Sequence, residues 1–226
     1  MKIGIEEHAL LYGLLVKNAC AVLGEEKGKE IMAKATRHYG ICRGKRMKKN
    51  ALRLGYGDST AGYMLSGEWQ GEPGENQSEL FYEKDSVRSE VHVCKWCDTW
   101  KKYDLMSYGP LYCQYIDKAI AEGFAGDFTL HVNSILSAGD PVCMFVWDRP
   151  ADKTAIAETR KNRQESLIRP FSFHCGELLA CTKEILEENV PQEAAEILRQ
   201  TENDFRTLKP EAAEFFVQII QSVYVY

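Results

Sequence analysis

The sequence predicts an α+β fold: N-terminal helices, a small antiparallel sheet with one inserted helix, and a C-terminal helical extension. Three observations support this. Apolar residues recur at three- and four-residue spacing near the N-terminus, they alternate in the middle of the chain, and the helical spacing returns after residue 154. We expect a hydrolase-like core over residues 1–150 and a helical extension, packed on that core, over residues 151–226.

Three helical patterns fill the N-terminal segment, and we expect them at residues 5–24, 25–39 and 40–54. Gly24 ends the first, and the glycines at 55 and 57 end the third. Residues 59–65 suit a short helix. The composition of residues 67–77, rich in Gly, Glu, Pro and Asn, predicts a loop.

Alternating apolar residues in the middle of the chain predict the sheet. We expect one or two strands in residues 79–94, an irregular segment in 96–108, a helix in 110–122, and a hairpin formed by 128–135 and 142–147. Pro110 suits a first helical turn because its missing N–H is unpaired there in any case. The remaining chain predicts helices over 154–188, 191–206 and 209–224, interrupted by Pro170 and Pro191.

Composition narrows the functional classes. The 226 residues carry a net charge of -5, and 45% of them are hydrophobic. The negative net charge argues against nucleic-acid binding. No apolar stretch reaches the length of a membrane span. The start of the chain carries Glu6, Glu7 and His8 where a secretory signal would be apolar. We therefore expect a cytoplasmic protein acting on a small molecule. An apolar C-terminal stretch is compatible with the formation of a homodimer.

The candidate chemistry concentrates between Cys94 and Trp147, where thiols, carboxylates and His131 lie within about fifty residues. Cys113 and Asp117 are four residues apart on the expected helix, so they share a face. A thiol that attacks an amide or amidine carbon needs a partner for proton transfer, which fits this pair. A buried thiol beside a structural carboxylate has the same pattern.

Asp140 and Cys143 flank the return strand of the hairpin. Gly139-Asp140-Pro141 is a good turn sequence without any chemistry, and Cys143 also suits plain packing. The alternative is that the strand crosses the inserted helix and brings Cys143 beside Cys113. We expect the Cys143 face of the hairpin to pack against that helix.

Further candidates lie outside this segment. His174 follows Pro170 and is a candidate for proton transfer supplied by the extension. Arg43 is a candidate for binding a substrate carboxylate, because arginine pairs with carboxylates in bidentate fashion. Both residue types are also common in the core or on solvated faces. Cys94 and Cys97 form a C-x-x-C, so zinc bound through Cys94, Cys97, Cys113 or Cys143 is open but not favoured, since no second such pair exists.

An ordered series of short motifs resembles a known family. Ala35 to Gly44 reads A-x-x-x-Y-G-I-x-R-G, Cys113 to Asp117 reads C-x-x-x-D, and Gly139 to Phe145 reads G-D-x-x-C-x-F. Together with Gly123-Phe124, these resemble the L-2-amino-thiazoline-4-carboxylic acid hydrolase family over roughly residues 10 to 148. The hairpin is also similar to the bacteriochlorophyll 4-vinyl reductase type of small-molecule-binding domain. Some members of that group bind zinc through a cysteine at the position occupied here by Ile135.

The first resemblance implies a hydrolase that opens a small cyclic amidine or amide ring by C–N bond hydrolysis and gives an N-carbamoyl amino acid. Cys113 would be the nucleophile, Asp117 and His174 would transfer protons, and Arg43, His131, Asp140 and Cys143 would contact substrate. The second resemblance keeps a different class open, a small-molecule-binding or sensor domain without catalysis. No DNA-binding or signalling segment is evident in the sequence, which favours the enzyme.

Overall fold

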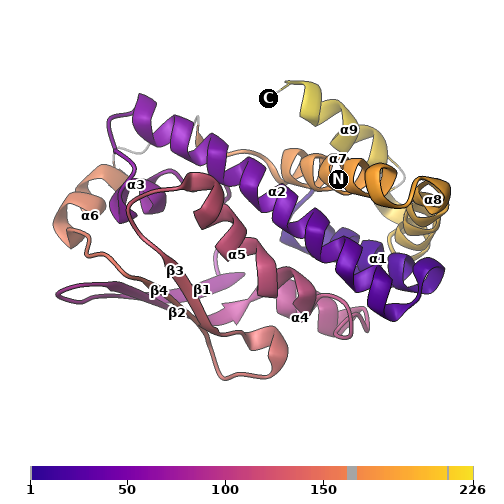
Figure 1. Ribbon diagram of the computed structural model, residues 1–226, viewed down its shortest axis with the longest axis horizontal. Coiled ribbons are helices and arrows are strands. Elements are labelled where there is room, and N and C mark those ends of the chain that lie inside the picture. Colours follow the sequence, from indigo (N-terminus) through magenta and orange to yellow (C-terminus); the bar gives the residue numbers. More distant parts are fainter. Residues whose placement is uncertain (1, 162–166, 213, 226) are drawn as a thin grey trace. The chain divides into compact units, whose positions relative to one another are not determined.

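The computed structural model describes residues 2–161, 167–212 and 214–225 and confirms the predicted α+β fold class (Figure 1). The chain forms two compact units, each assembled from separate segments. A helical unit contains the chain up to Tyr39, Lys95–Tyr112 and the chain from Pro170. A sheet unit contains Gly40–Cys94 and Cys113–Arg169. Residues beyond 150 thus contribute to both units, while a fold boundary at 150 stays a prediction.

The helical unit is organised around α1 (Ile5–Leu23), which is buried along nearly its whole length. Leu10, Leu11 and Leu15 have no exposed surface, and a helix that is apolar on all sides must be covered on all sides. The covering helices are α4 (Lys95–Lys102), α7 (Phe171–Asn189) and α8 (Pro191–Leu208). α9 (Phe215–Val225) packs on α7 after a 3₁₀ turn, η3 (Pro210–Ala212). Figure 1 shows these C-terminal helices grouped around α7.

The sheet unit contains one four-stranded antiparallel sheet in the order β1-β2-β4-β3. Its strands are β1 (Asn76–Tyr82), β2 (Val87–Cys94), β3 (Leu130–Ser134) and β4 (Cys143–Trp147). Its helices are the second half of α2 (Glu25–Arg53), α3 (Thr60–Leu65), most of α5 (Pro110–Phe124) and α6 (Lys153–Lys161). The predicted hairpin is confirmed, with Leu130 opposite Trp147.

The core of the sheet unit lies between α5 and one sheet face. Ala121 of α5 clusters with Val87, Leu130 and Trp147 from three strands. Tyr63 and Phe128 cover this cluster from the side. Cys143, Phe145 and Trp147 alternate along β4, so they share one face. The Cys143 face of the hairpin therefore packs against the inserted helix, as the sequence predicts.

Several predicted boundaries are wrong, for identifiable reasons. The expected break between two helices at residue 40 does not exist, because α2 runs unbroken from Glu25 to Arg53. Residues 95–102, expected to be irregular, form α4, since Cys97 and Trp100 are buried at helical spacing. The expected helix over 154–188 is two helices, α6 and α7, and residues 162–166 lie outside the described part. Pro170 is the N-cap of α7, and Pro191 opens α8. No helix in the described ranges has the length and apolarity that a membrane crossing requires.

A cluster of ion pairs ties α1 to two other parts of the helical unit. Glu6 Oε1 accepts hydrogen bonds from Lys102 Nζ at 2.8 Å and Tyr103 Oη at 2.9 Å, and Lys209 Nζ lies 2.8 Å away. Lys209 Nζ also donates to Glu7 Oε1 at 2.9 Å. Burial opposes ionisation of Glu6, but these bonds outweigh it and hold its pKa well below the usual range.

We predict that Glu6→Gln lowers the free energy of unfolding at pH 7 by about 1–2 kcal/mol, after allowing for solvent screening. Because the folded-state pKa is depressed, this contribution is complete above the ordinary carboxyl pKa and is lost progressively as pH falls from there toward the depressed folded-state pKa. Denaturant unfolding at pH 7 and pH 3.5 measures the difference between variant and parent, which should shrink at the lower pH. The exposed Glu30, which pairs with neighbouring Lys34, is the control, and Glu30→Gln should change nothing measurable. A deficit of equal size at both pH values would contradict the ionic origin.

Candidate functional site

The site begins with the close approach of α5 to α2 within the sheet unit. A Cβ at Gly44 would lie 2.1 Å from the carbonyl oxygen of Ile120, and one at Gly40 would lie 2.6 Å from the Ala119 Cβ. On the other helix, a Cβ at Gly123 would lie 2.3 Å from the Ile41 carbonyl oxygen. Only glycine permits backbones to approach this closely. The contact holds α5 against α2 on one side, while Ala121 faces the sheet on another.

Two β-bulges lie at the end of the sheet where β4 begins. On β2 the register shifts between the Ser78 and Gln77 pairings so that His92 is inserted, and on β3 it shifts so that Asn133 is inserted. An inserted residue reverses the alternation beyond it and re-aims the following side chains. Val91 pairs with Cys143, so strict alternation along β2 would place Cys94 on the opposite face of the sheet from Cys143. The β2 bulge reverses this alternation, which accounts for the electrostatic interaction of Cys94 with Cys113.

Three thiols gather at this end of the sheet. Cys113 lies at the start of the sheet-unit part of α5, and ionisation of its thiol is opposed by Cys94, Asp117 and Cys143. Burial is the largest influence and raises the pKa of the Cys113 thiol well above its ordinary value, while a hydrogen bond from Ser137 acts in the opposite direction. All eight cysteines carry thiols, not disulfides. In the resting protein Cys113 is therefore protonated.

Asp117 lies one helical turn after Cys113 and interacts with the charge of Arg43. Burial raises its pKa from 3.8 to about 6, and the Arg43 guanidinium opposes part of that rise. Tyr63 interacts with both charges, and burial raises the pKa of its phenol above the ordinary range. Arg43 itself is 5% exposed. A carboxylate with a pKa near 6 is ionised at neutral pH and is a stronger base than an ordinary aspartate.

Asp140 and Cys143 hold the turn that joins the two hairpin strands. Asp140 Oδ2 accepts the backbone N–H of Ile135 at 2.8 Å, and Cys143 Sγ accepts that of Leu136 at 3.2 Å. These bonds brace the 3₁₀ turn η1 (Leu136–Ala138), which ends at Gly139 in the left-handed region with φ 95°. Asp140 also lines a pocket.

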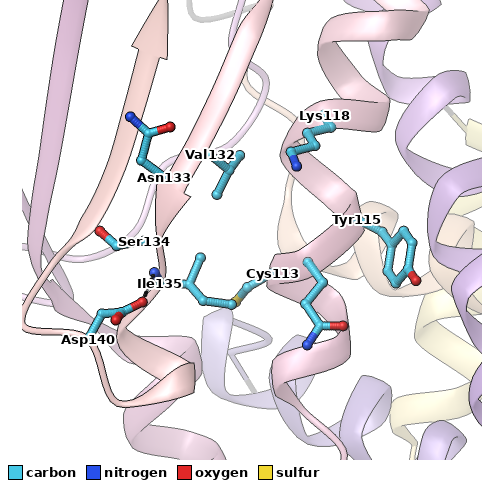
Figure 2. A pocket seen from close by; sticks show the side chains of 9 residues that line it. Cys113, Tyr115, Lys118, Val132, Asn133, Ser134, Ile135 and Asp140 are labelled. Atoms are coloured by element: carbon cyan, nitrogen blue, oxygen red, sulfur yellow. Dashed lines mark hydrogen bonds between the residues drawn. The ribbon is translucent and has the colours of Figure 1, made fainter.

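That pocket has a volume of about 340 Å³ and lies between α5 and the β3 end of the sheet (Figure 2). Figure 2 shows the Cys113 sulfur directed toward Ile135, with Lys118 one turn and a half further along the same helix. The lining residues are Cys113, Gln114, Tyr115, Lys118, Val132, Asn133, Ser134, Ile135 and Asp140. The volume is at the lower end of the range for small-molecule sites, and the lining carries a thiol, a cation and a carboxylate.

The structure brings together most of the sequence-predicted site residues, but not all. Cys113 and Asp140 line the pocket. In the same unit, Asp117 and Cys143 interact electrostatically with Cys113, and Arg43 interacts with Asp117. His131 is exposed on β3, and alternation turns it to the face opposite Val132. It lies near Asp148 instead, whose pKa is lowered chiefly by the backbone N–H of Thr129 and slightly by His131. His131 does not line this pocket, and its expected contact with substrate stays a prediction.

His174 is a buried residue of the helical unit, packed at ring-centroid distances of 5.7 Å from both Phe171 and Phe173. Its role as a proton-transfer group stays a prediction. Of the C-x-x-C pair, Cys94 ends β2 and Cys97 lies buried in α4. Within the described residues, the sulfurs of Cys94, Cys113 and Cys143 do not form a group with all members within 4.8 Å of one another.

Sequence reasoning missed Lys118, Ser134 and Ser137. Lys118 follows Asp117 on a helix rich in candidates, so its position on the pocket side of α5 could have been found from helical spacing with Cys113 and Gln114. Ser134 and Ser137 had no comparable signal, because a bulge and a short turn place them. The nearby Arg46 is engaged elsewhere, since its guanidinium donates to both carboxylate oxygens of fully buried Glu68 at 2.6 and 2.9 Å.

Comparison with known proteins gives one match. The family model described as L-2-amino-thiazoline-4-carboxylic acid hydrolase matches residues 4–147, a range that includes α1 through β4 and every residue lining the pocket. No curated protein and no solved structure matches the chain.

We predict that Asp117→Asn stabilises the protein at neutral pH. Since the pKa of Asp117 is raised in the folded state, the folded protein holds a proton that the unfolded chain releases, and stability falls as pH rises between about 4 and about 6. The variant avoids this loss, which corresponds to about 3 kcal/mol for a shift of this size. Unfolding at pH 4.5 and pH 7.5 should show a gain that is larger at the higher pH. Asp127→Asn, at an exposed position of the same unit, is the control, and a variant less stable than the parent at pH 7.5 would contradict the prediction.

Proposed function

The chain belongs to the L-2-amino-thiazoline-4-carboxylic acid hydrolase family, and from that premise we propose that it opens a small cyclic amidine that carries a carboxylate, with Cys113 as nucleophile. One observation carries the proposal: the pocket that exposes the Cys113 side chain also presents one cation, Lys118, and one carboxylate, Asp140. The substrate class in the family description has the complementary pair, an amidine and a carboxylate.

Charge complementarity supports an orientation of such a ring. The Lys118 ammonium is suited to the substrate carboxylate, and Asp140 is suited to the protonated amidine, which is the only strongly basic group of this substrate class. Side-chain amides of Gln114 and Asn133 offer further hydrogen bonds. With the two charged ends held, the amidine carbon lies within the part of the pocket that Cys113 borders.

The pair Cys113 and Asp117 supports proton transfer during attack. A thiol with a raised pKa is a weak nucleophile until its proton leaves, and Asp117, which interacts electrostatically with Cys113, is able to take that proton at neutral pH. Arg43 keeps Asp117 ionised enough to act, because it opposes the rise that burial imposes on the pKa. The same Asp117 then returns the proton to the leaving atom.

The reaction balances in two stages. In the first, Cys113 Sγ bonds to the amidine carbon, its proton passes to Asp117, and the C=N electrons move to the ring nitrogen. The tetrahedral carbon then expels one ring atom, which takes the proton from Asp117. In the second, water adds to the same carbon and Cys113 Sγ leaves, so that one water is consumed and the thiol is restored.

Leaving-group chemistry identifies the ring bond that breaks in a thiazoline. Expulsion of the ring sulfur gives an N-carbamoyl product with a free thiol, and expulsion of the ring nitrogen gives an S-carbamoyl product with a free amine. A thiol of pKa near 8.5 leaves more readily than an amine, so the sulfur is favoured. The C–N hydrolysis expected from the sequence then applies only to amidine or amide rings without sulfur. The N-carbamoyl product expected from the sequence also forms from a thiazoline when its ring sulfur leaves.

The first test is turnover of 2-amino-thiazoline-4-carboxylate, followed by thiol release and by mass spectrometry of the product. We predict that Cys113→Ala reduces kcat by at least about 10³-fold, because the covalent route is lost, while the unfolding temperature changes little. Cys20→Ala, at a buried thiol of the helical unit, is the matched control and should retain activity.

Three results would redirect this proposal. Normal turnover by Cys113→Ala would show that the thiol is not the nucleophile and would favour attack by a water molecule activated by Asp117. A product with a free amine would show that the ring nitrogen leaves. Saturable binding without turnover by the parent protein would favour the alternative class, a binding or sensor module.

We also predict that Lys118→Gln raises KM for the carboxylate substrate by about 10-fold or more with a smaller effect on kcat, since a charge-assisted hydrogen bond is worth about 1.5–3 kcal/mol. Steady-state kinetics on 2-amino-thiazoline, the same ring without its carboxylate, provides the internal comparison. There the variant and the parent should have equal KM values. Lys49→Gln, at an exposed lysine of α2, should affect neither substrate. A KM increase for both ring compounds would show that Lys118 does not bind the substrate carboxylate specifically.

A further inference from the structure

Ser137 is the one polar residue of the η1 turn, and it is buried. Only 5% of its surface is exposed, and in the described part of the chain its Oγ makes no hydrogen bond of ordinary geometry. The group within its reach is the sulfur of Cys113, on which it acts as a hydrogen-bonding partner. A buried hydroxyl without a settled partner costs free energy, so its retention beside a nucleophile needs a reason.

The turn that presents Ser137 is held from both sides. Asp140 Oδ2 and Cys143 Sγ accept the N–H groups of Ile135 and Leu136, the two residues before Ser137. Ser134 Oγ donates to the Val142 carbonyl oxygen at 2.8 Å and closes the base of the hairpin. Because each of these bonds fixes backbone next to Ser137, its Cα has little freedom to move away from α5.

We propose that Ser137 is a positioning residue that orients and activates the Cys113 sulfur by donating a hydrogen bond to it, and that Cys143 and Asp140 serve this purpose by holding the η1 turn. The inference rests on the proposed role of Cys113 as nucleophile. It assigns Cys143 a structural task in the site in place of contact with substrate.

The physical basis is a difference between two states of the sulfur. A thiol is a weak hydrogen-bond acceptor, whereas a thiolate is a strong one. The Ser137 bond is therefore made chiefly as the proton of Cys113 moves to Asp117, and it stabilises the attacking state more than the resting state. This explains why the hydroxyl is left without a well-formed bond at rest.

The test measures Cys113 directly and does not require turnover. The full chain is alkylated with iodoacetamide across a pH series, and modification of the Cys113 peptide is followed by mass spectrometry. Ser137→Ala should raise the apparent pKa of Cys113 by about one unit, so that the rate at a fixed pH below that pKa falls about tenfold. Ser137→Thr, which keeps the hydroxyl, should restore the parent value.

Ser89→Ala is the matched control, because Ser89 is a buried serine of the same unit, 6% exposed, on β2. It should leave the Cys113 titration unchanged. The proposal is overturned if Ser137→Ala titrates like the parent, or if Ser89→Ala shifts the titration equally. Should Ser137→Ala fail to fold, the alkylation profile of Ser137→Thr decides, since a shift of a unit there would also refute the role. A normal Ser137 effect with full activity in Cys113→Ala would instead refute the proposed nucleophile alone.

Discussion

The candidate site depends on the backbone contact between α2 and α5. Gly40 and Gly44 on one helix and Gly123 on the other remove every Cβ that would hold the backbones apart. This contact fixes the rotation of α5 about its axis, and so decides which side chains face the sheet. Arg43 directly precedes Gly44, so the same approach brings its guanidinium to Asp117. An extra methyl at Gly44 would meet the Ile120 carbonyl oxygen and displace the helix that carries Cys113.

The sheet adapts to that helix by departing from regular pairing at one end. Bulges at His92 and Asn133 lie on the two strands beside β4, close to where β4 begins. Regular alternation would turn Cys94 away from α5. The bulges redirect the side chains that follow them, and the pocket beside Cys113 lies next to the β3 bulge, with Asn133 and Ser134 in its lining. The candidate site therefore lies at the irregular end of the sheet, and not at its regular core around Trp147.

Stability and chemistry conflict at Asp117. Burying a carboxylate costs free energy, and its raised pKa is a direct sign of that cost. Arg43 recovers part of it without neutralising the group, which leaves a base suited to a thiol that burial keeps protonated. By contrast, the carboxylate of Glu6 in the helical unit is paired with lysines, which hold its pKa below the usual range. The pKa values of these two acids thus shift in opposite directions because their partners differ.

The sequence by itself determined the α+β class, the hairpin and the helical face shared by Cys113 and Asp117, because each follows from local spacing, and an ordered series of motifs indicated the family. It misassigned Gly40 as a helix break, since a glycine needed for close packing and one that ends a helix look alike in a single chain. It also placed His131 among the substrate contacts, and that stays a prediction, since His131 is exposed on β3 and does not line the pocket. Tertiary structure alone decided the places of Ser134, Ser137 and Cys94, because a pocket between a helix and a bulged sheet arises from contacts between segments far apart in sequence, and no periodic pattern encodes such contacts.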